Sequence, residues 1–252
     1  MAFLEMKYTS EVMQLRTSIN ILIPQQRVEG QPLNVLWLLH GLSDDHTGWM
    51  RLTSIERYVE DKNLCVIMPC VDRSFYTDMA YGNKYFTFLT EELPEALSVM
   101  FNLSRKREHN YVAGLSMGGY GAFKVGLNYP DRYCKAASLS GALDFEYIYQ
   151  SDHGSAIDHE RLMQLIHGNL DNFVHSRSDL NHMAELRAKE NNLPDLYMCC
   201  GKADFLYGCN QRYLHHLKAL GIPITYEEEE GYEHSWAYWD LKIQRVIQWM
   251  GI

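Results

Sequence analysis

The chain has 252 residues, with 46% hydrophobic and 22% charged residues, a composition typical of one globular α/β domain rather than a disordered or fibrous protein. Its formal net charge of −9 at pH 7 argues against nucleic acid and anionic membranes as partners, because both attract basic surfaces. The opening MAFLEMKYTS lacks the pattern of a signal peptide, and no apolar run approaches the ~18 residues of a membrane span. We therefore expect a single cytoplasmic domain covering residues 1–252.

The cysteine and histidine patterns carry no sign of a metal or a disulfide framework. The cysteines lie mostly in apolar, strand-like runs without CxxC spacing, which favours free buried thiols in a reducing compartment. There is no HExxH, and residues 114–121 do not fit a nucleotide-binding glycine loop, so we expect neither metal nor cofactor. The six cysteines are Cys65, Cys70, Cys134, Cys199, Cys200 and Cys209.

Eight apolar segments predict eight strands. The first two, residues 3–10 and 15–24, have a rough period of two, and we expect them to form an antiparallel edge. Five buried strands follow, each ending in Gly, Pro or a small polar residue where a turn is needed, and a more polar strand comes last. These six segments are residues 34–41, 64–71, 110–116, 135–141, 195–201 and 223–234.

Helical patterns fill the intervals between the strands. Pro94 falls inside one of them and is expected to start or kink a helix there. Alternating strands and helices predict an α/β fold, with a mostly parallel eight-stranded sheet and helices on both faces. The helical patterns cover residues 54–63, 85–102, 117–130 and 210–221, with a further helix at the end of the chain.

Residues 143–192 interrupt this alternation. The segment is rich in His, Asp and Asn and carries short helical patterns but no strand, so we expect a small helical insertion after the sixth strand, over one end of the sheet. Its larger apolar side chains are expected to shape a substrate pocket. They are Phe145, Tyr147, Tyr149, Leu162 and Phe173.

The segment GLSMG at residues 114–118 fits the G-x-S-x-G pattern, directly after a predicted strand and directly before a predicted helix. In that setting a tight turn presents the serine, Ser116, at a helix N-terminus, and Gly114 and Gly118 give the turn room. The alternative is a close helix–strand crossing with an incidental serine. Ser116 is therefore a candidate nucleophile that needs further support.

A nucleophilic serine needs a general base and an acid that orients it, in the chain order Ser, Asp or Glu, His. Asp204 follows the seventh predicted strand, and His234 follows the eighth. Both therefore fall at the carboxyl ends of strands, the edge where open α/β sheets build their sites. We predict that His234 takes the proton of Ser116 and that Asp204 holds the imidazole in the required tautomer.

Other candidates fit these roles less well. His215 and His216 lie in a helical pattern, and five further histidines lie in the insertion, so only His234 combines a loop after a strand with a position after the acid. The five are His153, His159, His167, His175 and His182. Asp195 precedes its strand, Asp240 falls in the final helix, and Glu233 adjoins His234 and would point elsewhere.

Acyl transfer also needs N–H donors for the oxyanion. One is expected at Met117, directly after the nucleophile, and the other at Leu42, in the loop after the third strand, where Gly41 lets the chain turn closely. His40 is expected to be structural, packed beneath the site.

Several longer motifs resemble one known family. LLHGLSDDHTGWMRLTSIERY, AGLSMGGYGAFKVGLNYPDRY, CGKADFLYGCN and GYEHSWAYWD together resemble the esterase D-like α/β-hydrolases, with the bacterial tributyrin esterases as the nearest group. The resemblance covers nearly the whole chain and is vaguest in residues 143–192. It implies an α/β-hydrolase fold, cofactor-free hydrolysis of short-chain carboxylic esters, and the roles given above to Ser116, Asp204, His234, Leu42 and Met117.

The leading hypothesis is thus a serine carboxylesterase for small-molecule esters. Members of the wider group act on S-formylglutathione or on acetylated and feruloylated carbohydrates, so a thioesterase and a carbohydrate esterase remain open. A silent hydrolase fold serving as a binding module is the non-enzymatic alternative, but such proteins usually lose the serine or the histidine. A homo-oligomer is compatible with the sequence.

Overall fold

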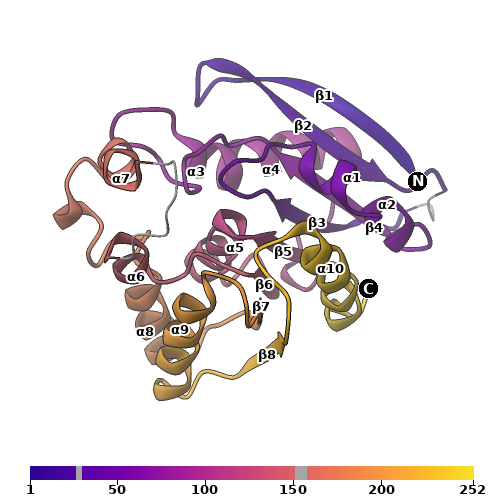
Figure 1. Cartoon of the computed structure of the whole chain (residues 1–252). Helices are drawn as coiled ribbons and strands as arrows, with labels where there is room; N and C mark the ends of the chain where they lie inside the picture. The colour runs from indigo at the N-terminus through magenta and orange to yellow at the C-terminus, as the bar shows by residue number, and fades with distance from the viewer. Residues whose placement is uncertain (27–29, 151–157) are drawn as a thin grey trace.

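The computed structural model describes residues 1–26, 30–150 and 158–252, which contain one eight-stranded sheet. The strands are β1 (Ala2–Ser10), β2 (Leu15–Ile23), β3 (Asn34–Leu39), β4 (Leu64–Pro69), β5 (Asn110–Leu115), β6 (Lys135–Leu139), β7 (Asp195–Gly201) and β8 (Ile224–Glu229). Their order across the sheet is β1-β2-β4-β3-β5-β6-β7-β8 (Figure 1).

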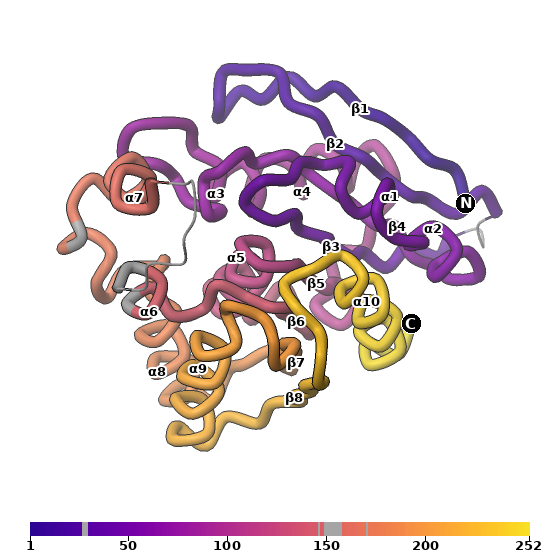
Figure 2. Tube along the Cα trace, viewed as in Figure 1, coloured from indigo at the N-terminus to yellow at the C-terminus, as the bar shows by residue number. Residues whose placement is uncertain are grey.

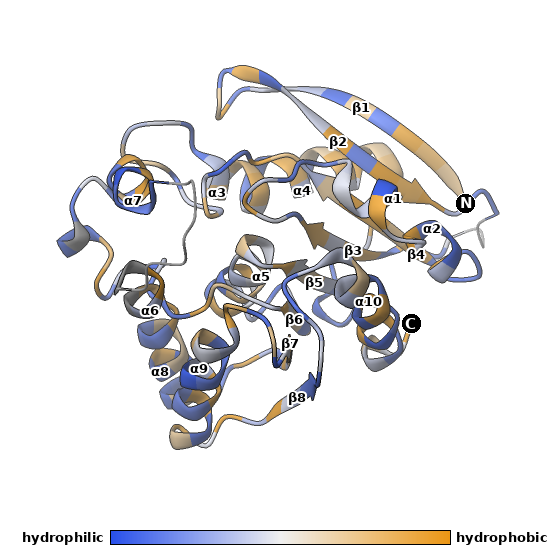
Figure 3. Ribbon diagram, viewed as in Figure 1, coloured by the Kyte–Doolittle hydropathy of each residue, from blue (hydrophilic) through white to orange (hydrophobic). Residues whose placement is uncertain are grey.

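The sheet is mixed, with its antiparallel part at one edge. β1 pairs antiparallel with β2 and β2 antiparallel with β4, whereas β3 to β8 run parallel. β1 alternates between half-buried and exposed residues, which Figure 3 shows as alternating colours along the strand. β4 is buried throughout, as expected for a strand covered on both faces. The predicted antiparallel edge and mostly parallel sheet are confirmed.

Helices cover both faces of the sheet. One hydrophobic core joins the sheet to α4, α5, α8 and α9, and the other joins it to α1, α2 and α10. Figure 1 shows α8 and α9 side by side on one flank and α10 on the other. The helices are α1 (Gly48–Leu52), α2 (Ile55–Tyr58), α3 (Tyr85–Thr87), α4 (Leu93–Phe101), α5 (Met117–Asn128), α6 (Phe145–Gln150), α7 (His159–His167), α8 (Leu180–Glu190), α9 (Tyr207–Ala219) and α10 (Trp236–Met250), with the π-helix η1 (Phe88–Glu92) and the 3₁₀-helices η2 (Arg107–His109) and η3 (Leu170–Asn172).

Pro94 lies in the first turn of α4, directly after the π-helix η1. Proline has no N–H, so it cannot satisfy the carbonyl four residues earlier, at Thr90. The Arg132 guanidinium fills that place and donates to Thr90 O over 2.7 Å. The prediction that Pro94 starts or kinks a helix is confirmed.

Residues 140–194 connect β6 to β7 and carry α6, α7, η3 and α8; within the predicted insertion, residues 151–157 lie outside the described part of the chain. The trace in Figure 2 places α7 beside α3, although the two are far apart in sequence. Backbone hydrogen bonds join α7 to the loop that precedes α3, from Ala80 N to Ile166 O (2.8 Å) and from Tyr81 N to Leu165 O (3.0 Å). Among the described helices, none has both the length and the apolar character needed to cross a bilayer.

Candidate active site

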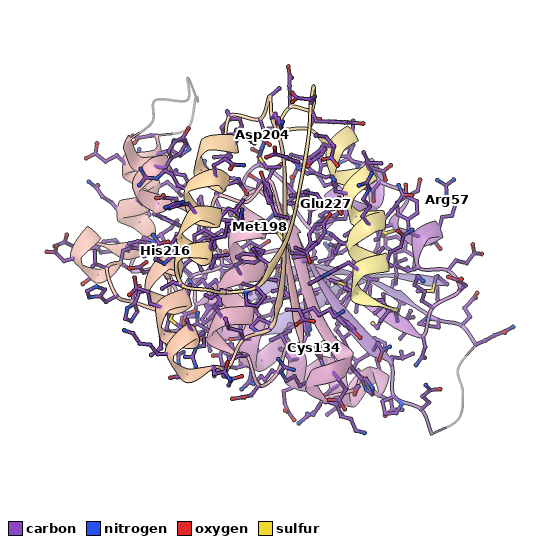
Figure 4. The ribbon with its side chains drawn as sticks, turned by 90° about the horizontal axis from the view of Figure 1, so that it is seen from below. Arg57, Cys134, Met198, Asp204, His216 and Glu227 are labelled. Carbon is purple, nitrogen blue, oxygen red and sulfur yellow. The ribbon has the colours of Figure 1, made fainter. Side chains whose placement is uncertain are left out.

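The three predicted catalytic side chains lie at the carboxyl ends of parallel strands. Ser116 directly follows β5, Asp204 follows β7 and His234 follows β8. In Figure 4, Asp204 lies at one end of the sheet, while Cys134, which precedes β6, lies at the opposite end. The topology alone therefore brings residues from three distant parts of the sequence to one edge.

Ser116 has a backbone conformation that residues with side chains rarely adopt, with φ +54° and ψ −119°. It occupies the turn between β5 and α5. Its N–H donates to Leu139 O (2.9 Å), and its carbonyl accepts from Ala142 N (3.1 Å) and Tyr120 N (3.1 Å). These three backbone hydrogen bonds hold the strained turn, which carries the side chain out of the strand and over the edge of the sheet.

The two glycines around Ser116 are required by close backbone contacts. A Cβ at Gly114 would lie 2.3 Å from Gly118 O, so the strand end and the first turn of α5 touch each other. A Cβ at Gly118 would lie 2.3 Å from Leu39 O and 2.7 Å from His40 O, at the end of β3. The spacing of the motif thus reflects two backbone approaches that leave no room for a side chain.

His234 joins the serine to the aspartate. Its Nε2 lies 3.0 Å from Ser116 Oγ, and its Nδ1 lies 2.8 Å and 3.0 Å from the two carboxylate oxygens of Asp204. A carboxylate only accepts, so Nδ1 carries the hydrogen, and Nε2 is left to accept from the serine hydroxyl. The structure therefore brings Ser116, His234 and Asp204 together in the arrangement that the sequence predicts.

Packing and hydrogen bonds hold the side chains of Asp204 and His234 in place. The Asp204 side chain is fully buried and also accepts from Leu206 N over 2.8 Å. The His234 ring lies between Phe205 and Trp239, with centroid distances of 4.5 Å and 4.8 Å. Asp204 is therefore orientated by a backbone amide as well as by His234.

His40 lies beneath the loop that follows β3 and is buried, as predicted. Its Nδ1 lies 2.7 Å from Gly41 O, and its Nε2 accepts from Val71 N over 3.1 Å. Burial lowers the pKa of this imidazole, which favours the neutral tautomer that both bonds need. A trans peptide points its C=O and N–H in opposite directions. Anchoring Gly41 O on His40 therefore turns Leu42 N–H away from His40.

A cavity of about 470 Å³ opens over the serine. Its walls combine aromatic and aliphatic side chains with polar ones, as is usual for small-molecule sites. The lining residues are Gly41, Leu42, Ser43, Asp44, Leu115, Ser116, His159, Phe205, His234, Ser235, Trp236 and Trp239.

The pocket residues predicted in the insertion do not form this cavity. Phe145 is buried elsewhere, with its ring against Phe75 and Tyr120 at 5.4 Å and 5.0 Å, and Leu162 is also part of the core. Tyr147 and Phe173 likewise pack against that core, and the side chain of Tyr149 is outside the described residues. That prediction is wrong for the four described residues, because a helical pattern does not reveal which buried face adjoins the site. The insertion contributes His159 instead, which no motif marked.

Within residues 1–26, 30–150 and 158–252, no three His, Cys, Asp or Glu side chains come close enough to hold a metal ion.

Residues 10–250 match the model of the esterase family, described as "Putative esterase". The chain belongs to the esterase family. An acetyl esterase of Caldicellulosiruptor saccharolyticus is 31% identical over 262 residues, covering 99% of this chain and 98% of that protein. The family, the α/β-hydrolase fold and the enzyme class predicted from the sequence are thus confirmed, and this esterase is a carboxylic ester hydrolase.

Solved structures agree with this assignment. The fluorophosphonate-binding serine hydrolase F of Staphylococcus aureus (FphF) is 35% identical to this esterase, with a TM-score of 0.90 and coverage of 99% and 98% of the two chains. The S-formylglutathione hydrolase FrmB of Staphylococcus aureus is also 35% identical, with a TM-score of 0.87 and the same coverage. A ferulic acid esterase at 22% identity shares the fold, with a TM-score of 0.83.

Proposed function

We propose that this esterase hydrolyses short-chain acyl esters through a covalent acyl-enzyme on Ser116. The observation that carries the proposal is the position of His234, whose two ring nitrogens lie within 3.0 Å of Ser116 Oγ and of the buried Asp204 carboxylate. A serine hydroxyl is a weak nucleophile on its own, and a base within hydrogen-bonding distance, itself held by a third group, activates it.

In the first half-reaction, Ser116 Oγ attacks the ester carbonyl carbon while His234 Nε2 takes the hydroxyl proton. The imidazolium that results is stabilised by the Asp204 carboxylate through Nδ1–H. The same Nε2 then gives the proton to the departing alkoxide as the acyl C–O bond breaks, so the alcohol leaves neutral and the acyl group stays on Ser116.

The oxyanion formed in this step is assigned to two backbone donors, Met117 N–H and Leu42 N–H. Met117 is the first residue of α5, so its amide is one of the unpaired N–H groups at a helix N-terminus. The His40 bond to Gly41 O turns Leu42 N–H away from His40, and Leu42 lines the cavity beside Ser116, which supports its assignment as the second donor. Two such donors, fixed before the substrate arrives, stabilise charge without reorganisation.

In the second half-reaction, a water replaces the alcohol. His234 Nε2 takes its proton while the hydroxide attacks the acyl carbon, and the proton passes to Ser116 Oγ as the C–Oγ bond breaks. The carboxylic acid leaves and the enzyme is restored.

The size of the cavity supports small acyl groups. A volume of about 470 Å³ shared by the acyl and alcohol parts suits an acetyl or butyryl ester, including tributyrin-like triesters with one arm inserted. The relative named as an acetyl esterase, aligned over nearly its full length, supports the same range.

We further propose that residues 1–252 form one domain, and that the buried thiols of Cys199, Cys200 and Cys209 reflect a reducing, cytoplasmic location.

A thioesterase of the S-formylglutathione hydrolase type is the second candidate, favoured by the 35% identity to the Staphylococcus aureus FrmB structure. Relative kcat/KM values on S-formylglutathione and on p-nitrophenyl acetate decide between the two activities. A preference for the thioester of a hundredfold or more would replace the carboxylesterase proposal.

The test of the nucleophile is Ser116→Ala, assayed with p-nitrophenyl butyrate. Loss of a catalytic serine lowers kcat by about 10⁶ when the whole triad acts as a unit, and the oxyanion donors and substrate binding leave a small residual rate. Ser235→Ala is the matched control, because Ser235 lines the same cavity without touching the triad hydrogen bonds described above. Wild-type turnover by Ser116→Ala, or an equal loss in both variants, would refute the assignment.

A further inference from the structure

The cavity over Ser116 has an uneven charge. Asp44 is the one carboxylate among its described lining residues, and none of them is a lysine or an arginine. The basic groups there are the imidazoles of His159 and His234, and the latter is committed to Ser116 and Asp204. A half-buried carboxylate thus lines a cavity that also presents three aromatic side chains, those of Phe205, Trp236 and Trp239.

Asp44 lies close to the reacting serine. Both side chains crowd the Cα of Gly41: a Cβ built there would lie 2.9 Å from Asp44 Oδ2 and 3.7 Å from Ser116 Cβ. The Asp44 amide also donates to Gly41 O over 3.3 Å, so its backbone belongs to the loop that presents Leu42 N–H. A substrate bound to Ser116 therefore lies within range of the Asp44 charge.

Trp236 flanks the same carboxylate. A Cβ at Gly48 would lie 3.1 Å from the Trp236 ring and 3.6 Å from Asp44 Cβ, which places the two side chains around one point. The indole is held edge-to-face between Trp49 and Trp239, with centroid distances of 5.3 Å to each. A rigid aromatic surface attracts an organic cation, and a carboxylate beside it adds a charge of the opposite sign.

The charge balance of the site points the same way. Burial raises the pKa of the Asp44 carboxyl, which shows that the charged form lacks full compensation where it stands. A negative group beside the oxyanion-binding loop also opposes the negative charge that develops during acyl transfer. A cation on the substrate would relieve both effects, whereas an anionic leaving group would add to them.

The departing alcohol lies on this side of the cavity, because it must receive its proton from His234 Nε2. His234 and Asp44 line the same cavity, and the Trp239 ring contacts both the His234 ring and the Trp236 ring, with centroid distances of 4.8 Å and 5.3 Å. Asp44 and Trp236 therefore adjoin the alcohol part of an ester.

We propose that the alcohol subsite, formed by Asp44 and Trp236 with Trp239 and Phe205, selects esters whose alcohol carries a permanent or protonated ammonium group. This inference rests on the proposed ester hydrolysis and adds the substrate class. The covalent steps are unchanged: the acyl C–O bond breaks, the alcohol takes its proton from His234, and the ammonium charge leaves with it.

The experiment compares butyrylcholine with 3,3-dimethylbutyl butyrate, which has the same shape but carries a neutral carbon in place of nitrogen. We expect kcat/KM to favour butyrylcholine by at least about tenfold, the scale of a partly desolvated cation–aromatic contact reinforced by a carboxylate.

Asp44→Asn removes the charge and keeps an oxygen acceptor of similar size. We expect it to lower the butyrylcholine preference to about twofold or less, by the loss of that electrostatic contribution. Asp45→Asn is the matched control, because Asp45 is adjacent and carries the same charge but is exposed and does not line the cavity. It should keep the wild-type preference.

Three outcomes would overturn the inference: equal kcat/KM for the two butyrates in the wild type, an unchanged preference in Asp44→Asn, or an equal loss of preference in Asp45→Asn. If Asp44 only stiffens its loop, both substrates lose rate equally in Asp44→Asn and the preference stays. Hydrolysis of the neutral ester reports on the proposed function by itself, so its absence would count against ester hydrolysis rather than against the cation subsite.

Discussion

His40 offers a sharp test of how the oxyanion site is built, because its two hydrogen bonds can be removed one at a time. Nδ1–H donates to Gly41 O, and Nε2 accepts from Val71 N. The side-chain nitrogen of asparagine is separated from Cβ by the same number of bonds as Nδ1 of histidine. The side-chain oxygen of glutamine is separated from Cβ by the same number of bonds as Nε2 of histidine. His40→Asn can therefore keep the bond to Gly41 O, and His40→Gln can keep the bond from Val71 N.

The two variants should differ more in activity than in stability. His40→Asn leaves Val71 N without its partner, which costs about 1–3 kcal/mol in the free energy of unfolding, and His40→Gln removes one of the two hydrogen bonds to Gly41 O, which costs about 0.5–1.5 kcal/mol. Only His40→Gln frees the Gly41–Leu42 peptide to turn. Complete loss of an oxyanion donor lowers kcat by about 10²–10³. In His40→Gln the loss is partial, because Asp44 N still donates to Gly41 O over 3.3 Å, so we expect kcat to fall by about 10- to 100-fold.

The assay is steady-state hydrolysis of p-nitrophenyl butyrate together with urea unfolding of both variants. In His40→Gln the loss should appear in kcat with KM nearly unchanged, because the oxyanion donor acts in the transition state and not in substrate binding. The kcat of His40→Asn should stay within about threefold of the wild-type value, a smaller change than the loss of an oxyanion donor would cause. Equal losses of kcat in the two variants would refute the view that the Nδ1 bond aims Leu42 N–H.

Two further predictions concern stability. Gly118→Ala places a methyl group 2.3 Å from Leu39 O, so it should lower the free energy of unfolding by about 1–3 kcal/mol or more. Urea titration measures this loss, and an unchanged midpoint would show that α5 can move away from β3. Lys124 is buried and donates to Thr77 Oγ1 (2.6 Å) and Ser178 Oγ (2.9 Å), and burial lowers its pKa to about 7. In the unfolded chain the pKa of this lysine is about 10.4, so between about pH 7 and pH 10.4 the unfolded chain holds more protons than the folded one. The free energy of unfolding therefore rises with pH by up to about 1.4 kcal/mol per pH unit because of this residue. Lys124→Met should remove that rise between pH 7 and pH 9, and parallel pH dependences for the variant and the wild type would contradict it.

The sheet could be predicted from the sequence because its central strands are buried on both faces and stand out as continuous apolar runs. The short helix α1 could not. α1 has five residues and is stabilised by a tertiary contact, the bond from Trp49 Nε1 to Leu39 O (3.0 Å), which leaves no periodic pattern. The last strand ends at Glu229 rather than at residue 234, since Gly231 adopts φ +75° and turns the chain away. The placement of β4 between β2 and β3 is also absent from any local pattern.

The candidate site divides in a similar way. Ser116, Asp204 and His234 could be predicted because each directly follows a strand, and strand ends meet at one edge of a parallel sheet. The walls of the cavity could not, because they come from side chains whose direction depends on tertiary packing. His159 comes from the connection between β6 and β7, and Trp236 from the start of α10.

The central claim is that Ser116 forms a covalent intermediate with the aid of His234. The most direct measurement is peptide mass spectrometry of the protein after treatment with a fluorophosphonate, compared with His234→Ala treated in the same way. We predict one phosphonyl group on the peptide containing Ser116 in the wild type, and slow or no labelling in His234→Ala, because the serine then lacks its base. Labelling of another residue, or equal labelling of Ser116 in the two proteins, would contradict the account.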